Sequence, residues 1–376
     1  MKCIVHFYAD WLDFRLAEFD ALLQLYNLVP SEVYDQQNCP LTSSQHFLFA
    51  ELPNDEVAKG ICSRSVLIKS IQEYWGHGFG LSEIVSVVQT LPSVFLAPFF
   101  KAENSWSVQV DSFGKSLTMK QKQDYRVHFR FLDFEGPVDI KNAKVELWLN
   151  LDFSLCPLSY GEGGTEANPM VPIYLGRALG WGGMKKERIK YDLKNRLYLG
   201  PTSLDDSLAL ILANMCGVRK GTIAYDPFVG TASILVALSH FGAFCVGSDI
   251  DPRVLRGEMY AGPHDRSRDT TKRDIIENFK AYGLQIPELV RMDNHALDRH
   301  CYFGAASSVY AGMFDVIVTD PPYGIRAGAR KSGKAKPINY NIDDNDRSTH
   351  VPSTQQYPVE EVMLDLMHTA AKVLVW

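Results

Sequence analysis

The chain has 376 residues, 46% of them hydrophobic, and a formal net charge of −6. This size suits two or three folded domains, and the negative charge disfavours nucleic-acid binding except through local basic clusters. Its seven cysteines, with no Cys-x-x-Cys pair, argue against a disulfide framework and a zinc site. Asp10 comes too early for a signal sequence, and no apolar run is long enough to span a membrane. We therefore expect a cytoplasmic protein with no bound metal.

The first 72 residues are predicted to form a small α+β domain. Their elements approximate the βαββαβ order of a ferredoxin-like fold. The expected strands are Ile4–Tyr8, Phe47–Leu52 and Val66–Ile71, and the expected helices are Asp13–Tyr26 and Asn54–Cys62, the latter opened by an Asn cap. The domain is acidic, so we do not expect it to bind RNA by itself.

Residues 73–180 are predicted to form a second α+β domain, which includes the glycine-rich loop Pro157–Pro172. The expected elements are strands at Ser105–Asp111 and Lys144–Asp152 and a helix at Thr118–Phe131. The basic residues on and before this helix suit phosphate contacts and the solvated side of a helix equally well. They are Lys115, Lys120, Lys122, Arg126 and Arg130.

Two stretches of the chain concentrate positive charge. Residues 177–196 contain seven basic residues against two acids, and Lys185, Lys186 and Arg188 are among them. Residues 321–342 contain no acid, and their basic residues are Arg326, Arg330, Lys331, Lys334 and Lys336. Both stretches are candidates for binding a phosphate-bearing substrate. A flexible loop that is merely soluble would have a similar composition.

Residues 181–376 are predicted to form an α/β domain. The strand Thr222–Asp226 leads through a tight turn into the helical segment Ile234–Leu238, an arrangement that binds nucleotide-like ligands at the first crossover. The residues expected to bind the ligand here are Asp226, Pro227, Phe228, Gly230 and Thr231. The turn lacks the other glycines of a G-x-G-x-x-G fingerprint, so a dinucleotide dehydrogenase is disfavoured. The helix predicted at Ser203–Asn214 is expected to close one side of the pocket.

Acidic residues also end the next two predicted strands. The strand Phe244–Asp249 places a carboxylate 23 residues after Asp226, near the spacing of about 20 at which an acid binds ribose hydroxyls, and Ile250 follows it. Asp293, after the apolar stretch Ile286–Val290, is a candidate acceptor for an adenine amine. A helix cap would explain Asp293 equally well.

The apolar run Phe314–Thr319 is typical of a strand buried in a parallel sheet, and Asp320-Pro321-Pro322-Tyr323 follows it at the ligand-binding end. Asp320 offers a carboxylate to the protons of an exocyclic amine. The two prolines hold their carbonyls rigidly outward, and Tyr323 can stack on a base, which contributes about 1–3 kcal/mol. Although such dipeptides also occur in ordinary turns, the motif and the three acids together predict methylation of an amine with S-adenosylmethionine as the cofactor.

Several segments resemble the catalytic subunit of the eukaryotic tRNA guanosine-10 N2-methyltransferases, a THUMP-containing family of class I methyltransferases. These segments are Met1–Phe14, Arg196–Asp205, Asp226–Thr231, Gly247–Asp251 and Asp320–Arg326. The resemblance implies tRNA as the substrate and a THUMP-type RNA-binding domain at residues 73–180. It also implies a small zinc-binding activator subunit that docks beside the strand near Glu288–Arg291.

The same resemblance implies a Rossmann-like sheet of strand order 3-2-1-4-5-7-6. The sequence supplies strands 1 to 4, a helix at Val359–Ala371 and at most the beginning of strand 5 at Lys372–Trp376. We therefore expect a C-terminally incomplete domain whose fourth strand is an exposed edge. One alternative is an inactive or regulatory shortened form that binds RNA or a partner. Another is an rRNA guanine-N2 or DNA adenine-N6 methyltransferase, which would share the tetrapeptide.

Overall fold

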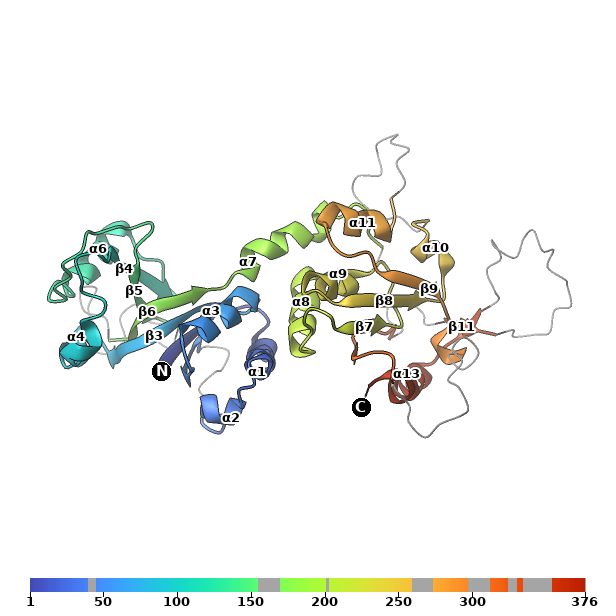
Figure 1. The fold of residues 1–376 in the computed structure, drawn as a ribbon, viewed down its shortest axis with the longest axis horizontal. Coiled ribbons are helices and arrows are strands. Elements are labelled where there is room, and N and C mark those ends of the chain that lie inside the picture. Colours follow the sequence, from blue (N-terminus) through green and yellow to red (C-terminus); the bar gives the residue numbers. More distant parts are fainter. Residues whose placement is uncertain are drawn as a thin grey trace, which may run out of the picture. The chain divides into compact units, whose positions relative to one another are not determined.

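The computed structural model describes residues 1–39, 45–154, 170–200, 203–258, 273–296, 312–323, 330–333 and 354–375. The chain divides into two compact units, Met1–Met184 and Lys185–Trp376 (Figure 1), and each has its own sheet. Within the described ranges, no helix is both long enough and apolar enough to cross a membrane.

A six-stranded sheet of order β2-β1-β3-β6-β5-β4 organises the first unit. Neighbouring strands are antiparallel, except for the parallel pair β4 and β5. The strands are β1 (Lys2–Phe7), β2 (Phe47–Glu51), β3 (Ile68–Phe79), β4 (Trp106–Phe113), β5 (Val145–Asp152) and β6 (Pro172–Trp181). Each strand predicted for this region is present, and β6 is a further strand that the sequence patterns did not indicate.

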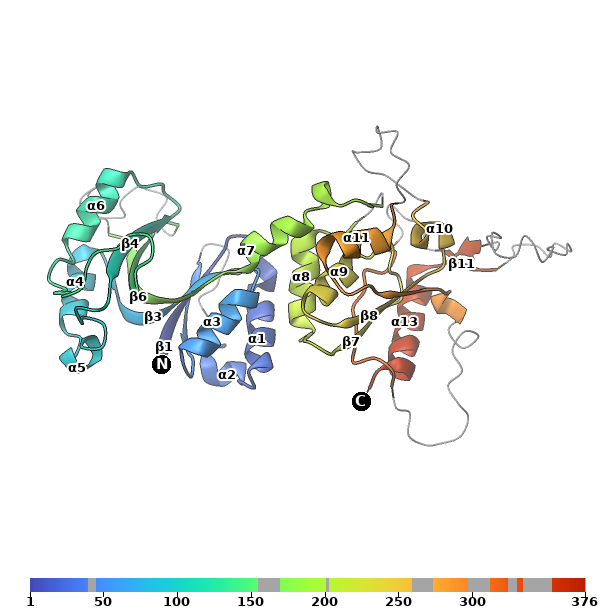
Figure 2. The ribbon, with the colours of Figure 1, turned by 45° about the horizontal axis from the view of Figure 1, so that its top comes forward.

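Close backbone contacts explain why β6 contains glycines, which weaken a strand pattern. A Cβ on Gly176 would lie 2.7 Å from the Cβ of Gln72 in β3, and a Cβ on Gly180 would lie 2.9 Å from that of Cys62. Because β6 pairs with both β3 and β5, it joins the two parts of the sheet. Figure 2 shows β3 and β6 running side by side along this unit.

The helices of the first unit pack on the sheet in two groups, and each group belongs to a separate hydrophobic core. The first group is α1 (Arg15–Leu25), α2 (Pro30–Val33) and α3 (Asp55–Arg64), and the second is α4 (Leu81–Gln89), α5 (Ser93–Leu96) and α6 (Met119–Val127). The Asn54 side chain accepts the Val57 N–H at 3.0 Å, which confirms the predicted cap of α3. Thr118 and Gln121 form a capping box at the start of α6.

The predicted boundary between residues 72 and 73 falls inside β3, so a single strand serves both predicted N-terminal domains. The division into residues 1–72 and 73–180 stays a prediction.

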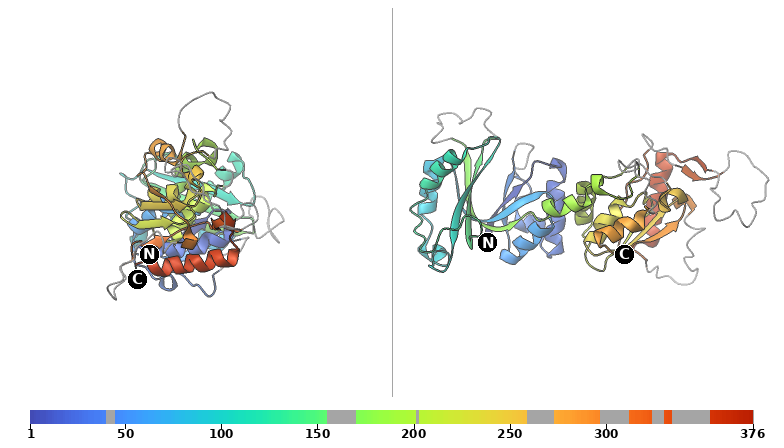
Figure 3. Two further views of the ribbon diagram at one scale, coloured as in Figure 1. Left: turned by 90° about the vertical axis from the view of Figure 1, so that its right-hand side faces the viewer. Right: turned by 90° about the horizontal axis from the view of Figure 1, so that it is seen from above.

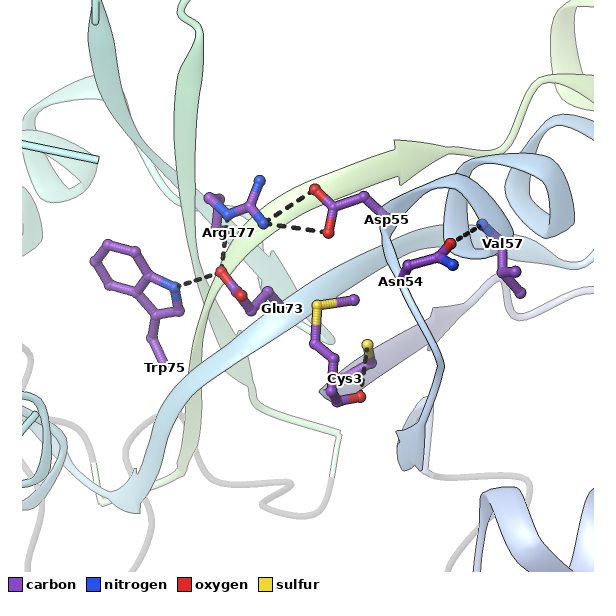
Figure 4. A network of polar contacts seen from close by, with 8 residues as sticks. Cys3, Asn54, Asp55, Val57, Glu73, Trp75 and Arg177 are labelled. Atoms are coloured by element: carbon purple, nitrogen blue, oxygen red, sulfur yellow. Dashed lines mark hydrogen bonds and ion pairs between the residues drawn. The ribbon is translucent and has the colours of Figure 1, made fainter. Parts of the chain in front are cut away.

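An ion-pair network in the first unit connects β6, β3 and α3 (Figure 4). Arg177 Nε donates to Glu73 at 2.8 Å, and its terminal nitrogen lies 3.1 Å from an Asp55 oxygen. Trp75 Nε1 also donates to Glu73, at 3.2 Å. The Arg177 side chain is only 15% exposed, so it is a buried structural residue. Counting Arg177 as part of a basic RNA-binding stretch was wrong, because its charge is neutralised inside the unit.

The second unit contains a parallel sheet of order β10-β7-β8-β9. The strands are β7 (Ile223–Asp226), β8 (Phe244–Asp249), β9 (Glu288–Arg291) and β10 (Val316–Ile317). Counted as strands 1 to 4, they confirm the 3-2-1-4 part of the expected Rossmann-like order. The described helices are α7 (Met184–Glu187), α8 (Asp206–Met215), α9 (Ser233–His240), α10 (Pro252–Leu255), α11 (Ile275–Tyr282) and α13 (Val359–Val373). Figures 1 and 3 show α9 and α11 on one face of this sheet and α13, in red, on the other.

The ladder of β10 is longer than its assigned bounds, because Asp315 and Val318 also donate backbone N–H groups to carbonyls of β7. On the other side of β10, one isolated parallel bridge pairs Phe314 with Leu374. Leu374 lies in the segment that was expected to begin strand 5.

A short hairpin follows the tetrapeptide, where the sequence predicted a flexible basic loop. Arg330–Ser332 forms β11, which pairs antiparallel with β12 (Thr354–Gln356). The loop prediction is therefore wrong for these residues. Both strands are short and polar, so neither has the alternating apolar pattern that would reveal a strand. The other residues of the predicted loop beyond Tyr323, apart from Gly333, lie outside the described residues.

Candidate active site

The strands β7, β8, β9 and β10 point their carboxyl ends to one edge of their sheet, because all four are parallel. β7 ends at Asp226 and β8 ends at Asp249, whereas Asp293 lies just beyond β9 and Asp320–Tyr323 just beyond β10. The fold thus brings the predicted acids and the predicted tetrapeptide to the same edge from distant parts of the sequence.

The tight crossover between β7 and α9 borders open space at this edge. Gly230 has a φ of 50°, and a Cβ there would meet nothing within 4 Å. Gly247 in β8 lies against the turn, because a Cβ there would come within 2.5 Å of Val229 Cγ2. The other predicted ligand-binding residues of the turn are Pro227 and Thr231, which are buried, and Phe228, which is partly buried. The backbone at Gly230 is therefore the part of the turn that a ligand can reach most easily.

Asp226 lies beneath the edge with only 1% of its surface exposed. Its Oδ1 accepts the Thr319 hydroxyl at 2.6 Å and the Phe228 N–H at 3.0 Å. Burial, reinforced by the negative charges of Asp249 and Asp320, raises the pKa of the Asp226 carboxyl to about 7. Asp226 therefore links the end of β7 to Thr319, the residue that precedes the tetrapeptide. Because its side chain is buried, its role is to hold these two strand ends together.

Asp249 is partly exposed at the end of β8. Its Oδ2 accepts the Gly230 N–H at 3.1 Å and its Oδ1 accepts the Asp251 N–H at 2.9 Å. Burial raises the pKa of the Asp249 carboxyl. Since each carboxylate oxygen can accept a second hydrogen bond, Asp249 can still accept one from a ligand hydroxyl. Ile250 follows it and is also partly exposed.

Asp293 is 5% exposed, and both of its oxygens accept backbone hydrogen bonds. Oδ1 accepts the His295 N–H at 3.0 Å, at the start of the short 3-10 helix Asn294–Ala296. Oδ2 accepts the Ser332 N–H at 2.7 Å, from β11. The capping role considered for Asp293 is thus present, and the bond to the hairpin is an addition that the sequence did not indicate.

The tetrapeptide lies at the rim of the edge. Asp320 is exposed, Pro321 and Pro322 are partly exposed, and Tyr323 is 61% exposed. The partial burial of the Asp320 carboxyl raises its pKa, so this carboxyl is a better proton acceptor than a fully solvated aspartate. An exposed ring next to this acceptor can stack on a flat substrate.

The predicted RNA-binding residues lie in different environments. Arg330 is exposed, and its guanidinium donates to the Thr354 carbonyl at 3.1 Å. Arg188 donates to the Ser207 hydroxyl. The Lys331 side chain is only 11% exposed and is paired with Glu361, which weighs against a phosphate contact. Arg326 and Lys334, and the side chains of Lys185 and Lys186, lie outside the described residues.

Two contacts beside the site were not predicted. The Thr319 hydroxyl donates a hydrogen bond to Asp226. The sequence signal for this contact was a hydroxyl side chain directly before the tetrapeptide. Ser203, just before α8, lies 3.1 Å from Thr231, oxygen to oxygen. The role of Ser203–Asn214 in closing one side of the pocket stays a prediction.

The charge of the residues at this edge and the open space beside them both suit S-adenosylmethionine. The ion pairs of the described residues include none to Asp226, Asp249 or Asp320. The negative charges of Asp249 and Asp320 fit a sulfonium cation, and the spare lone pairs of Asp249 fit ribose hydroxyls. The open space at Gly230 leaves room for a ligand against the turn.

Two protein-family models match the chain. Residues 1–182 match the Tmrp11 THUMP N-terminal domain, and residues 194–335 match the RMKL-like methyltransferase domain.

Characterised relatives are similar over almost the whole chain. The tRNA (guanine(10)-N(2))-methyltransferase TRMT11 of Bos taurus is 32% identical over 97% of this chain and 75% of its own length, and that of Homo sapiens has the same values. The protein of that name from Dictyostelium discoideum is 32% identical over 100% of this chain and 72% of its own length. Among solved structures, TrmN from Thermus thermophilus is similar with a TM-score of 0.41 and 17% identity, over 86% of this chain and 80% of that one.

Proposed function

The chain belongs to the tRNA (guanine(10)-N(2))-methyltransferase family, and from this premise we propose that it transfers a methyl group from S-adenosylmethionine to the N2 amine of guanosine-10 in tRNA. The observation that carries the proposal is the position of Asp320–Tyr323. These hydrogen-bond acceptors and the exposed ring lie at the same sheet edge as Asp249 and the open turn at Gly230.

The tetrapeptide aligns the amine for an in-line attack. Asp320 and the carbonyl of Pro321 accept the two amine protons, and Tyr323 stacks on the guanine ring. S-adenosylmethionine, when bound, supplies a methyl group that is already activated by the sulfonium. The residues therefore act mainly by proximity and orientation. Asp320, whose pKa is raised by partial burial, then takes up the proton that the methylated amine releases.

The cofactor-binding residues divide into contacts and supports. Asp249 accepts the ribose hydroxyls, and the Gly230 turn together with Ile250 borders the cofactor. Asp226 and Thr319 hold the ends of β7 and β10 together beneath the site. The crossover is narrow at Gly247, where any side chain would meet Val229.

For tRNA binding, residues 73–180 act as the THUMP-type domain, and exposed cations near the site contact phosphates. Arg330 is the described cation of the hairpin that is accessible for this role, because Lys331 is paired with Glu361. Arg188, Lys185, Lys186, Arg326 and Lys334 are the remaining candidates.

A small zinc-binding activator subunit is part of the proposal, docked beside β9. This strand is last in the order β10-β7-β8-β9, so its outer side pairs with no other strand of the described sheet. Val290 is 46% exposed there. A partner strand added to such an edge would gain backbone hydrogen bonds. The location is proposed to be cytoplasmic, where the buried thiols Cys3, Cys62 and Cys245 would stay reduced.

The experiment that tests this function is a methyl-transfer assay of the purified chain, with and without the activator, on tRNA, rRNA fragments and DNA. Cofactor binding is measured separately by calorimetry. We expect methylated guanosine at position 10 of tRNA. Transfer only to rRNA or DNA would assign the chain to another amino-methyltransferase. RNA binding with no transfer to any substrate, even with the activator, would identify a regulatory form.

A further inference from the structure

Asp293 connects the cofactor-binding edge to the chain that follows the tetrapeptide. We propose that it is a positioning residue that fastens the β11–β12 hairpin beside the substrate site, and that it is not the acceptor of the adenine amine. This inference rests on the proposed function and deepens it. It replaces the role that the sequence suggested for Asp293.

The first argument is the burial of the Asp293 carboxylate, which is less exposed than that of Asp249. Its two oxygens accept the His295 N–H at 3.0 Å and the Ser332 N–H at 2.7 Å. At 5% exposure, the side chain offers little surface to a ligand that approaches from solvent. A hydrogen bond to a carboxylate is stronger than one between neutral groups. Removing it would leave the Ser332 N–H without that acceptor in a partly buried position.

The second argument is that other contacts hold the same hairpin from the side of α13. Lys331 of β11 pairs with Glu361 of α13, and its ammonium lies 5.5 Å from the centre of the Tyr357 ring. The Tyr357 hydroxyl donates to Asp365 of α13 at 2.6 Å.

The loop that contains Asp293 is fixed to α13 as well. His295 Nδ1 lies 2.7 Å from an Asp365 oxygen, and the Thr369 hydroxyl donates to Asn294 at 2.9 Å. One polar network therefore connects the hairpin, α13 and the loop that follows β9. The Asp293–Ser332 hydrogen bond links the hairpin directly to that loop.

The third argument is distance along the chain. Ser332 follows Tyr323 by nine residues, and an extended residue spans at most about 3.6 Å. A tether at Ser332 therefore limits how far Arg330, two residues before it, can lie from Tyr323. The tether lowers the ordering cost when a large substrate binds beside the tetrapeptide. It acts on the substrate side of the reaction and leaves cofactor affinity unchanged.

Three variants test this role. Asp293→Asn keeps the size of the side chain but weakens its acceptors, and Ser332→Pro removes the N–H donor while leaving the Asp293 carboxylate intact. Ser332→Ala is the matched control, because it keeps the backbone N–H. The Ser332 N–H points to Asp293, so it lies on the side of β11 away from β12, where a proline is tolerated.

Steady-state kinetics and calorimetry measure the effect. We expect Asp293→Asn and Ser332→Pro each to raise the KM for tRNA about ten- to a hundredfold. The kcat and the Kd for S-adenosylmethionine should change by less than about threefold, and Ser332→Ala should behave like the unmodified chain. A large loss of cofactor affinity in Asp293→Asn, with an unchanged Ser332→Pro, would restore the adenine-acceptor role and overturn the proposal.

Amide hydrogen exchange of the unmodified chain gives a readout that does not depend on activity. The Ser332 N–H should exchange slowly, and Asp293→Asn should accelerate its exchange more than that of amides in β7. Rapid exchange of this N–H in the unmodified chain would refute the tether even if the enzyme is active. Slow exchange in a chain that transfers no methyl group would leave the tether in place and count against the proposed function alone.

Discussion

The two units of this protein differ in which charges surround their buried ionisable side chains. In the first unit, the mostly buried Arg177 lies between Glu73 and Asp55, so its positive charge is neutralised by carboxylates of the same unit. In the second unit, Asp226 lies near two further carboxylates, and burial and their charges raise its pKa to about 7. A buried pair of opposite charges is complete within the fold. A group of like charges at a sheet edge costs stability and marks a site that suits a cationic ligand.

The largest effect is expected in the first unit. Arg177→Ala leaves Glu73 and Asp55 without their cation, and breaking a mostly buried pair in this way costs about 3–5 kcal/mol. The free energy of unfolding of the first unit, measured with denaturant, should fall by this amount, while cofactor affinity in the second unit stays unchanged. Lys101→Ala is the control within the same unit, since its pair with Glu103 is exposed and should matter by less than about 1 kcal/mol. Equal effects of the two substitutions would remove the contrast between buried and exposed pairs.

Asp226 is expected to make the second unit less stable as pH rises. Its pKa in the folded chain is about 7 against an ordinary value of 3.8, so the folded chain keeps a proton that the unfolded chain has lost. This contribution to stability is fully present below pH 4 and is lost as pH rises through 7, by about 4 kcal/mol at most. Asp226→Asn should flatten this part of the stability profile, since its amide oxygen can still accept from Thr319. An unchanged slope between pH 4 and 7 would show that Asp226 is ionised in the folded chain.

Loss of the acceptor at the rim should affect turnover more than binding. Asp320→Ala is expected to lower kcat about 10²- to 10³-fold, the usual effect of removing one preorganised polar group, while the Kd for S-adenosylmethionine changes little. Single-turnover methyl transfer and calorimetry separate the two quantities. Asp133→Ala, which removes an exposed acid of the first unit, is the control. A variant at Asp320 with normal turnover but weak cofactor binding would contradict the assigned role.

The smallest effect is expected at the exposed ring. Tyr323→Ala removes stacking that is worth about 1–3 kcal/mol, so kcat/KM for tRNA should fall about 5- to 150-fold. Tyr323→Phe keeps the ring face and should retain most of the activity. If the two substitutions are equally damaging, the hydroxyl and not the ring is the important group.

Much of the second unit could be predicted because its signals are local. The apolar runs that end in Asp226 and Asp249 indicated both a strand and the position of an acid, and the parallel order of the sheet then placed these acids at one edge. The class I methyltransferase fold and the family are confirmed. The roles assigned to the individual site residues stay predictions.

Other features depend on residues that are distant in sequence. β6 was not predicted because its glycines are explained only by the backbone of β3 and the side chain of Cys62 lying against them. The β11–β12 hairpin was missed because its strands are short and polar and are separated by many residues. Lys331 had the composition of an RNA contact, yet Glu361 on a later helix makes it an internal ion pair.

The sequence by itself indicated the strands with a local apolar pattern, where those strands end and which acids and aromatic groups follow them, since propensity and pattern act over a few neighbouring residues. Tertiary structure alone decided which of these groups are paired. The partner of Asp226 is Thr319, and that of Asp293 is the Ser332 N–H. The physical reason is that burial, hydrogen bonding and pKa depend on atoms brought together by folding, whatever their separation along the chain.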